Sequence, residues 1–335
     1  MNVLALGGSH TLLKVVKRYL QDEAVDHLTV IISPRHEKEL NIDKKSLGKL
    51  LHDAQKEYPS KFKAIHVLQT LRDDKFIESC AESDLNLSIS AAWIYNQWHL
   101  SHAQKIYQMH NTLLPNFRGG ASISWQILCG ERQSATTLFE IDEGVDTGKI
   151  VYSDPYIFPS TCRKPIDYLK YAESKAIDSL VEFLRLYKVN SKVISASSQQ
   201  ESFASYFPRL NTELNGCIDW DWTAEEVERF LLAFDDPYQG AHTKCTSIDG
   251  KIYLKDVISI HQIHKFHPFQ AGVIYNKDKL GLHICCKDGG ILVGKASDSN
   301  GKNLIDSLNI GDRLYNTSED LTAAKSSRIR YTPKN

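Results

Sequence analysis

The chain has 335 residues, 42% of them hydrophobic, and carries 40 basic against 41 acidic side chains. This length predicts two domains, or one large domain with an appendage, and the apolar content is ample for ordinary cores. The formal net charge of −1 gives no electrostatic case for a nucleic-acid partner or a membrane surface.

The cysteines and the first residues bear on the cellular setting. Among seven cysteines the only close pair is Cys285-Cys286, which is not a metal-ligand spacing. Free thiols in a reducing cytosol are therefore expected. The first residues, MNVLALGGSH, lack a basic lead and a long apolar stretch, so no signal peptide is predicted. No run approaches the ~20 apolar residues of a membrane span, and we expect a cytoplasmic protein.

The first elements predict a βαβ unit. Residues 3–6 are typical of a buried parallel strand, residues 11–22 have apolar residues at helical spacing, and residues 27–33 predict a second strand. Because no G-x-G-x-x-G follows the first strand, no dinucleotide site is expected. Gly7-Gly8 is most simply a tight turn between strand and helix. In the alternative, Gly8, Ser9 and backbone N–H groups at the helix start receive a substrate phosphate.

Strands and helices are then predicted to alternate up to residue 186. Strands are expected over 64–68, 85–93, 135–140 and 150–157, and helices over 73–83, 122–130 and 166–186. The strand over 85–93 ends in Ala92-Trp93-Ile94-Tyr95, at the carboxyl edge of the sheet, where open α/β sheets bind ligands. Core packing is the alternative role for Trp93 and Tyr95. The fold class is therefore α/β, with a Rossmann-like, mostly parallel sheet in the N-terminal domain.

The stretch from residue 106 to 150 organises the predicted site. Gln108 and His110 are two apart, so on a strand both point to the same face. Pro115 and Gly119-Gly120 break the chain directly afterwards, which favours a loop at the strand end. We expect Asp146 to fold back next to His110, with the carboxylate orienting the imidazole and raising its basicity. Taken alone, Asp146 would be read as a turn-capping aspartate.

This order of residues resembles the 10-formyltetrahydrofolate-dependent formyltransferase family, whose site has Asn-x-His, then Leu-Leu-Pro-x-x-Arg-Gly, then an Asp-x-Gly turn. The residues that match are His110, Leu113, Leu114, Pro115, Arg118, Gly119 and Asp146-Thr147-Gly148. The resemblance implies catalysis by His110, Asp146 and Gln108, with 10-formyltetrahydrofolate as co-substrate and no metal. The folate contacts that it implies are Ala92, Trp93, Ile94, Leu114, Pro115, Arg118, Asp142, Glu143 and Gly144.

Gln108 departs from the family pattern, since the family has asparagine there. In the family that amide helps to hold the oxyanion of the tetrahedral intermediate. The extra methylene lengthens the arm by about one C–C bond, ~1.5 Å. Losing a preorganised oxyanion donor typically costs about 100- to 1,000-fold in rate. Three outcomes follow: the loop is adapted to the longer arm, the activity is slow, or the chain has a non-catalytic role.

The C-terminal part has a different composition. Residues 1–192 are expected to form the catalytic domain, 193–205 a polar linker, 206–320 a smaller β-rich domain resembling an OB-like barrel, and 321–335 a disordered tail. Thr223 and Glu226 have the spacing of a capping box that opens a short helix. The histidines within 261–267 are expected to be solvated loop residues, since no further metal ligand joins them at a suitable spacing.

The substrate is indicated less directly. Ile123-Ser124-Trp125 and the segment 206–209 resemble nucleotide-sugar N-formyltransferases, which act on amino-deoxysugars for surface polysaccharides such as lipopolysaccharide, and Tyr206 would contact the sugar nucleotide. Methionyl-tRNA formyltransferase is the nearest rival, although a tRNA partner would require a basic face. Glycinamide ribonucleotide formyltransferases are usually shorter chains. A folate- or sugar-binding relative that lost turnover through Gln108 is the third alternative. Paired subunits are common among the sugar-type relatives, so a homodimer is one state to test.

Overall fold

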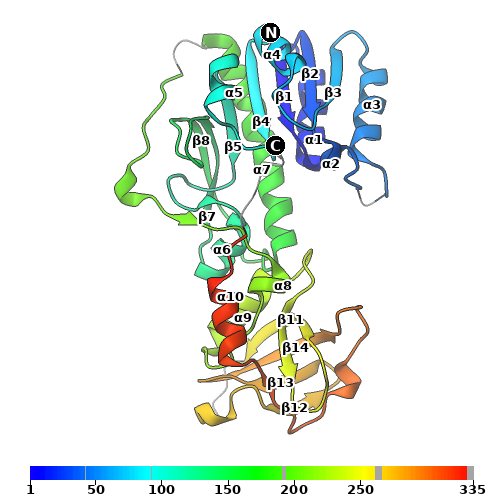
Figure 1. The fold of residues 1–335 in the computed structure, drawn as a ribbon, viewed down its shortest axis with the longest axis vertical. Helices are drawn as coiled ribbons and strands as arrows, with labels where there is room; N and C mark the ends of the chain where they lie inside the picture. Colours follow the sequence, from blue (N-terminus) through cyan, green and yellow to red (C-terminus); the bar gives the residue numbers. More distant parts are fainter. Residues whose placement is uncertain (42, 92, 191–193, 261–265, 330–335) are drawn as a thin grey trace.

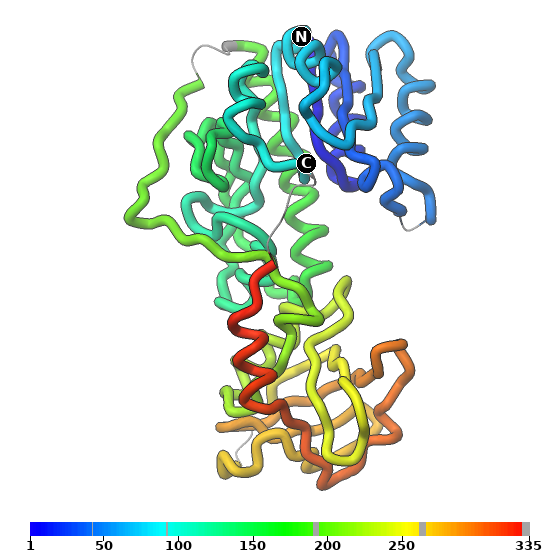
Figure 2. The backbone as a smooth tube through the Cα atoms, viewed as in Figure 1, coloured from blue at the N-terminus to red at the C-terminus, as the bar shows by residue number. Residues whose placement is uncertain are grey.

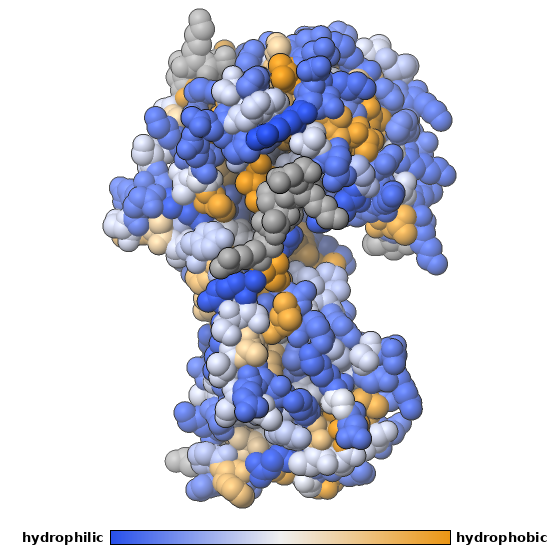
Figure 3. Space-filling model, viewed as in Figure 1, coloured by the Kyte–Doolittle hydropathy of each residue, from blue (hydrophilic) through white to orange (hydrophobic). Residues whose placement is uncertain are grey.

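The computed structural model describes residues 1–41, 43–91, 93–190, 194–260 and 266–329. The chain forms two bodies joined by the long helix α7 (Pro165–Asn190), which runs from the lower body into the upper one (Figure 1). The backbone trace shows the same arrangement (Figure 2), and the space-filling view shows a narrow waist between the bodies (Figure 3). Within the described residues, no helix combines the length and apolar character that a bilayer crossing requires.

The upper body is built on a seven-stranded sheet of order β3-β2-β1-β4-β5-β7-β8. The first five strands are parallel, and β7 and β8 continue the sheet in antiparallel fashion. The strands are β1 (Asn2–Gly7), β2 (His27–Ile32), β3 (Phe62–Val67), β4 (Leu85–Ile89), β5 (Ile106–His110), β7 (Gln133–Glu140) and β8 (Ile150–Ile157). The expectation of a Rossmann-like, mostly parallel sheet is confirmed.

Helices cover both faces of this sheet because its central strands are apolar on both sides. Val3 and Ala5 pack with α1, α3 and α7, whereas Leu4 and Leu6 pack on the opposite face with α4. The helices of this body are α1 (Ser9–Gln21), α2 (Pro34–Glu37), α3 (Leu47–Glu57), α4 (Asp74–Glu82), α5 (Gln97–His102) and α6 (Ser122–Cys129).

The lower body contains an antiparallel sheet of order β12-β13-β14-β11-β10-β15. A bridge between Val273 and Arg313 joins its two ends, so the sheet curls into the expected barrel-like domain. Helix α9 begins after Thr223, and the predicted capping box with Glu226 is confirmed. The elements are α8 (Thr212–Asn215), α9 (Ala224–Ala233), β10 (Ala241–Cys245), β11 (Ile252–Ile260), β12 (Ile274–Asp278), β13 (Gly281–Cys285), β14 (Gly290–Ser297) and β15 (Leu314–Tyr315).

The C-terminal tail differs from the prediction. Residues 321–326, expected to belong to a disordered tail, lie in helix α10 (Ser318–Ser326). Thr317 and Asp320 form a reciprocal capping box at its start, and the buried Ala324 packs it against the molecule. The local capping signal, rather than a strong apolar stripe, defines this helix. The prediction of a disordered end is therefore wrong for this segment.

One apolar core extends across the waist between the bodies. Ile123 and Phe158 of the upper body share a buried cluster with Trp220, Phe230 and Leu231 of the lower one. The domain limits drawn from the sequence stay predictions. All seven cysteines lie in the described residues without a disulfide, as expected. Of the 261–267 segment, residues 261–265 lie outside the described residues, and His267 caps a short 3₁₀ turn, Pro268–Gln270.

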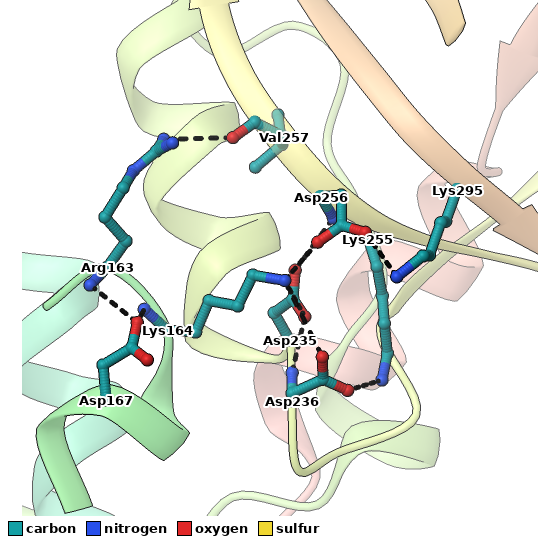
Figure 4. A network of polar contacts seen from close by, with 9 residues as sticks. All are labelled: Arg163, Lys164, Asp167, Asp235, Asp236, Lys255, Asp256, Val257 and Lys295. Atoms are coloured by element: carbon teal, nitrogen blue, oxygen red, sulfur yellow. Dashed lines mark hydrogen bonds and ion pairs between the residues drawn. The ribbon is translucent and has the colours of Figure 1, made fainter. Parts of the chain in front are cut away.

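A network of charged residues also joins the two bodies (Figure 4). Lys164 precedes α7, and its Nζ lies 3.3 Å from Oδ1 of the fully buried Asp235 and 3.7 Å from Asp236, and it is also paired with Asp256. Burial opposes the ammonium charge, but the hydrogen bond to Asp256 and the charge of Asp235 raise the pKa of Lys164 overall. Lys255 and Lys295 complete the network at its edge.

Replacing Lys164 should therefore destabilise the protein. Lys164→Met leaves the Asp235 carboxylate buried without its cation, and we expect the free energy of unfolding to fall by about 3 kcal/mol. Urea unfolding at pH 7 measures this loss. Lys295→Met is the matched control, because its side chain is 68% exposed and such pairs contribute about 1 kcal/mol or less. Equal losses in the two variants would contradict a special role for Lys164.

Candidate active site

The sheet has a switch point where ligands of open α/β sheets bind. Strand β1 lies between β2 and β4. From the boundary between β1 and β4, the strands that follow along the chain are therefore added in opposite directions, β2 and β3 on one side and β5 on the other. Ser9 follows β1 and Ser90 follows β4, and both line a cleft of about 550 Å³. Gly7 allows the close approach of these strand ends, since a Cβ there would meet the Ile89 carbonyl oxygen at 1.9 Å. The cleft is therefore the candidate active site.

Several predicted site residues line this cleft. They are Ser9, Trp93, Ile94, Gln108, Asp142, Gly144, Asp146 and Tyr206. Other predicted site residues, although described, are not part of its wall: Gly8, His110, Leu114, Pro115, Arg118 and Glu143. Ala92 lies outside the described residues. The structure thus brings the Gln108–Asp146 pair and the expected folate segment to one cavity, with His110 behind them.

Strained backbone gathers around the cleft. Seven non-glycine residues of the described chain have positive φ, and four of them line this cavity: Ser9, Ser90, Ala121 and Asp146. Each such residue costs of order 1–3 kcal/mol and persists where the surroundings fix it, which is common at functional sites. Asp146 has a φ of 55°, so its carboxylate is placed by a conformation that few residues adopt.

The Asp146 carboxylate joins the two halves of the expected motif. Its Oδ2 accepts a 2.8 Å hydrogen bond from the Gly119 N–H, and its Oδ1 accepts a 3.4 Å bond from Nε2 of Gln108. The longer arm of Gln108 therefore reaches the carboxylate. Gln108 Nε2 has a second N–H, which is the group that would meet an oxyanion in the cleft.

The geometry of His110 corrects one part of the sequence interpretation. Its Nδ1 lies 3.8 Å from Asp146 Oδ2, beside the carboxylate as expected but beyond hydrogen-bonding distance. Its Nε2 lies 3.0 Å from the Phe117 carbonyl oxygen, which can only accept, so Nε2 carries a proton. The ring is therefore oriented by Phe117, rather than by Asp146, and Nδ1 is the nitrogen that faces the carboxylate.

Arg118 binds within the protein and does not line the cleft. Its side chain is buried, and the guanidinium donates to Gln199 Oε1 at 3.0 and 2.8 Å and to both carboxylate oxygens of Glu201. These contacts within the protein hold the loop, and the folate contact of Arg118 stays a prediction. Leu114 is likewise buried, next to Pro115, with which it forms a cis peptide bond.

The cleft is also lined by two cations that were not predicted from the sequence. Arg35 follows β2, and Arg209 follows β9 (Tyr206–Phe207), which pairs in parallel with β6 (Arg118–Gly119). Neither guanidinium has a hydrogen bond or ion pair with another described residue. The sequence could have indicated Arg35, because it comes just after a predicted parallel strand. Nothing in the sequence indicates the β6–β9 pairing that brings Arg209 to the cleft.

Uncharged polar groups also point to a ligand. The Ser9 hydroxyl and the Trp93 indole N–H are buried without a partner among the described residues, and buried polar groups are normally paired. His36, also in the wall, lies 3.0 Å through Nδ1 from the Gly7 carbonyl. Burial lowers the pKa of His36, although this hydrogen bond opposes the shift. The described residues contain no group of three or more His, Cys, Asp or Glu side chains suited to a metal ion.

The chain is similar to solved structures of sugar N-formyltransferases. WlaRD, a sugar 3N-formyl transferase solved with dTDP and 5-N-formyl-THF, superposes with a TM-score of 0.64 at 18% identity, over 88% of this chain and 97% of that one. The N-formyltransferase from Helicobacter canadensis, in complex with folinic acid and dTDP-3-aminofucose, gives a TM-score of 0.64 at 19% identity, over 87% and 98% of the two chains. These likenesses establish a shared fold.

The amino-acid sequence matches a differently named relative. It is 27% identical to the methionyl-tRNA formyltransferase of Marinobacter nauticus over 217 residues, which is 64% of this chain and 66%, just under two thirds, of that protein. The family model for formyl transferase matches residues 1–162, and that for the formyl transferase C-terminal domain matches residues 211–309. The two matches together cover most of the chain, including most of the cleft residues and all but the last strand of the barrel. The chain belongs to the formyl transferase family.

Proposed function

We propose that this protein transfers the formyl group of 10-formyltetrahydrofolate to the amine of a nucleotide-linked amino sugar. The observation that carries the proposal is the presence of two unpaired arginines, Arg35 and Arg209, in the same cleft as Gln108 and Asp146. A nucleotide-linked amino sugar carries a diphosphate, which guanidinium groups bind well, and an amine on the sugar ring, away from the diphosphate. The two sugar N-formyltransferase structures, solved with folate and dTDP ligands, support the same assignment.

The folate would occupy the part of the cleft lined by Trp93, Ile94, Asp142 and Gly144. Trp93 offers an aromatic surface and an unpartnered N–H, and Ile94 is half exposed, so a planar pterin ring finds both stacking and a hydrogen-bond donor. Asp142 is held by the Thr147 hydroxyl at 2.6 Å and by the Gly144 N–H, which fixes its carboxylate at the edge of the cavity. No metal takes part in this proposal.

The sugar nucleotide would occupy the opposite part, near Ser9, Tyr206 and the two arginines. Ser9 is the first residue of α1, where backbone N–H groups and the helix dipole favour an anion. Tyr206 is 61% exposed, so its ring is available to a base or a sugar. The diphosphate would then lie between the helix start and Arg209.

These residues can catalyse the formyl transfer, and each proton that is released has an acceptor. The neutral amine forms a bond to the formyl carbon, the carbonyl oxygen becomes an oxyanion, and the second N–H of Gln108 donates to it. The ammonium proton passes to Asp146, which faces the cleft, and is shared with Nδ1 of His110 behind it. When the bond to N10 of the folate breaks, that nitrogen takes the proton back.

A substrate panel tests this proposal. Purified protein is mixed with 10-formyltetrahydrofolate and nucleotide-linked 3-amino- or 4-amino-sugars, and formamide products are sought by mass spectrometry. Product from at least one sugar is expected, and it would also identify the nucleotide and the position of the amine. No product from any member would overturn the sugar assignment.

Methionyl-tRNA formyltransferase is the second candidate, favoured by the name of the Marinobacter nauticus relative. The same panel includes charged initiator tRNA, and the formylated aminoacyl-tRNA is sought. A third candidate is a binding protein with weakened catalysis, motivated by Gln108. Tight binding of 5-formyltetrahydrofolate without turnover on any acceptor would favour it. The cytoplasmic location, the role in surface polysaccharides and the homodimer stay predictions.

Arg209 provides a separate test of the sugar-nucleotide assignment. Arg209→Ala should raise the KM for the sugar nucleotide by roughly 10-fold, since a hydrogen bond to a charged group contributes about 1.5–3 kcal/mol and this side chain is exposed. The KM for folate and kcat should change little. Steady-state kinetics measure all three. Arg185→Ala, on the outer face of α7 with 66% exposure, is the control. An unchanged KM for the sugar nucleotide would contradict the assignment.

A further inference from the structure

Gln199 lies at the centre of the contacts behind the site. It belongs to the segment predicted as a linker, which the backbone trace shows passing along the outside of the upper body (Figure 2). Its Oε1 accepts from Nε and Nη2 of Arg118 at 3.0 and 2.8 Å. Its Nε2 donates to the carbonyl oxygens of Asp146 and Gly148 at 2.9 and 2.7 Å. Both amide donors and the amide oxygen are therefore fully engaged.

These bonds act on the backbone that places the Asp146 carboxylate. Asp146 has positive φ, an uncommon conformation that aspartate tolerates better than most residues and that neighbouring contacts help to hold. The two carbonyls that Gln199 binds belong to Asp146 and Gly148, so the amide holds the backbone of the turn from Asp146 to Gly148. Without these donors, the turn loses the contacts that fix it from outside.

The other end of Gln199 holds the partner of that carboxylate. Arg118 immediately precedes Gly119, whose N–H donates to Asp146 Oδ2 at 2.8 Å. The Arg118 guanidinium also donates to both carboxylate oxygens of Glu201, so two residues of the segment 199–201 bind this side chain. Gln199 thus connects the loop that supplies the hydrogen-bond donor with the turn that supplies the acceptor.

We infer that Gln199 is a positioning residue for the reaction, acting through Asp146. The inference rests on the function proposed above, in which Asp146 receives the amine proton. A displacement of about 1 Å at a reacting group can lower a rate by about 100-fold, even when the substituted residue touches no substrate. Loss of the Gln199 donors should therefore lower kcat and leave substrate binding nearly unchanged.

Gln199→Glu is the decisive variant because it changes only one of the two sets of hydrogen bonds that the Gln199 amide makes. The carboxylate keeps its acceptor for Arg118, so the loop and the segment stay joined. It offers no donor to the Asp146 and Gly148 carbonyls, so the turn is released. We expect kcat to fall by about 100-fold, with each KM within about threefold of the wild type. The melting temperature should stay within about 3 °C.

Gln200→Glu is the matched control, since it makes the same change at the next residue, which is exposed and has no side-chain bond to the site. It should keep wild-type kcat. Gln199→Ala removes both ends and should lose both kcat and stability. Wild-type kcat in Gln199→Glu would overturn the inference, as would a rise in KM that matches the loss in rate, because either result assigns Gln199 a purely structural or binding role.

A readout besides activity keeps this inference distinct from the proposed function. In a crystal structure of Gln199→Glu, the Asp146 carboxylate should move out of hydrogen-bonding distance of the Gly119 N–H. A retained 2.8 Å bond would overturn the inference even if the enzyme assay gave no product. Wild-type protein that forms no formamide on any acceptor would instead defeat the proposed function alone.

Discussion

Asp146→Asn is expected to lower kcat by about 100- to 10,000-fold, the range for losing a general acid–base group. Asparagine has nearly the shape of aspartate and tolerates positive φ, so the turn should persist. Its Oδ1 can still accept from the Gly119 N–H, which keeps the loop in place. What is removed is the negative charge, the capacity to take a proton from the amine, and the second carboxylate oxygen, which accepts from Gln108 Nε2. Steady-state kinetics with both substrates measure the effect.

The control for this variant is Asp142→Asn. Asp142 lines the same cleft and loses the same charge, but its carboxylate binds Thr147 and the Gly144 N–H within its own turn. Its kcat should fall by less than about 10-fold, with any larger effect seen in the KM for folate. Comparable loss of kcat in the two variants would show that the charge of the cleft matters, rather than proton transfer at Asp146.

The local parts of this fold could be predicted from the sequence. Strand β8 was expected over 150–157 and is Ile150–Ile157, because turn residues bound it on both sides, Asp146-Thr147-Gly148 before it and Pro159 after it. His110 and Asp146 come together through neighbouring strands, since β5 pairs with β7 and Asp146 lies in the turn before β8. Their proximity therefore needed only short-range topology.

The rest depends on contacts that leave no local pattern. Strand β4 ends at Ile89 instead of residue 93 because Ser90 adopts a φ of 52°. Tyr206 and Arg209 reach the cleft through a two-residue parallel pairing with Arg118–Gly119, which is too short to carry a hydrophobic period. Gln199 looked like part of a polar linker because its role is expressed in hydrogen bonds to carbonyls far along the chain. Polar positioning residues of this kind need coordinates to be recognised.

His110→Ala is the second change for which a large effect is expected, again about 100- to 10,000-fold in kcat. The reason is its position behind Asp146. With Nε2 carrying the proton that it shares with the Phe117 carbonyl, Nδ1 is left to take up the proton that arrives at the carboxylate 3.8 Å away. Without the ring, that proton has no second acceptor and is poorly placed for return to the leaving nitrogen. KM for both substrates should change much less than kcat.

A second substitution separates this role from support of the loop. In His110→Gln, the amide can still donate to the Phe117 carbonyl, but it has no basic nitrogen. If the ring acts on the proton, His110→Gln and His110→Ala lose kcat alike, while His102→Ala, on the exposed part of α5, keeps wild-type kcat. If His110→Gln retains near wild-type kcat, the ring serves to hold Phe117, and Asp146 must move the proton alone.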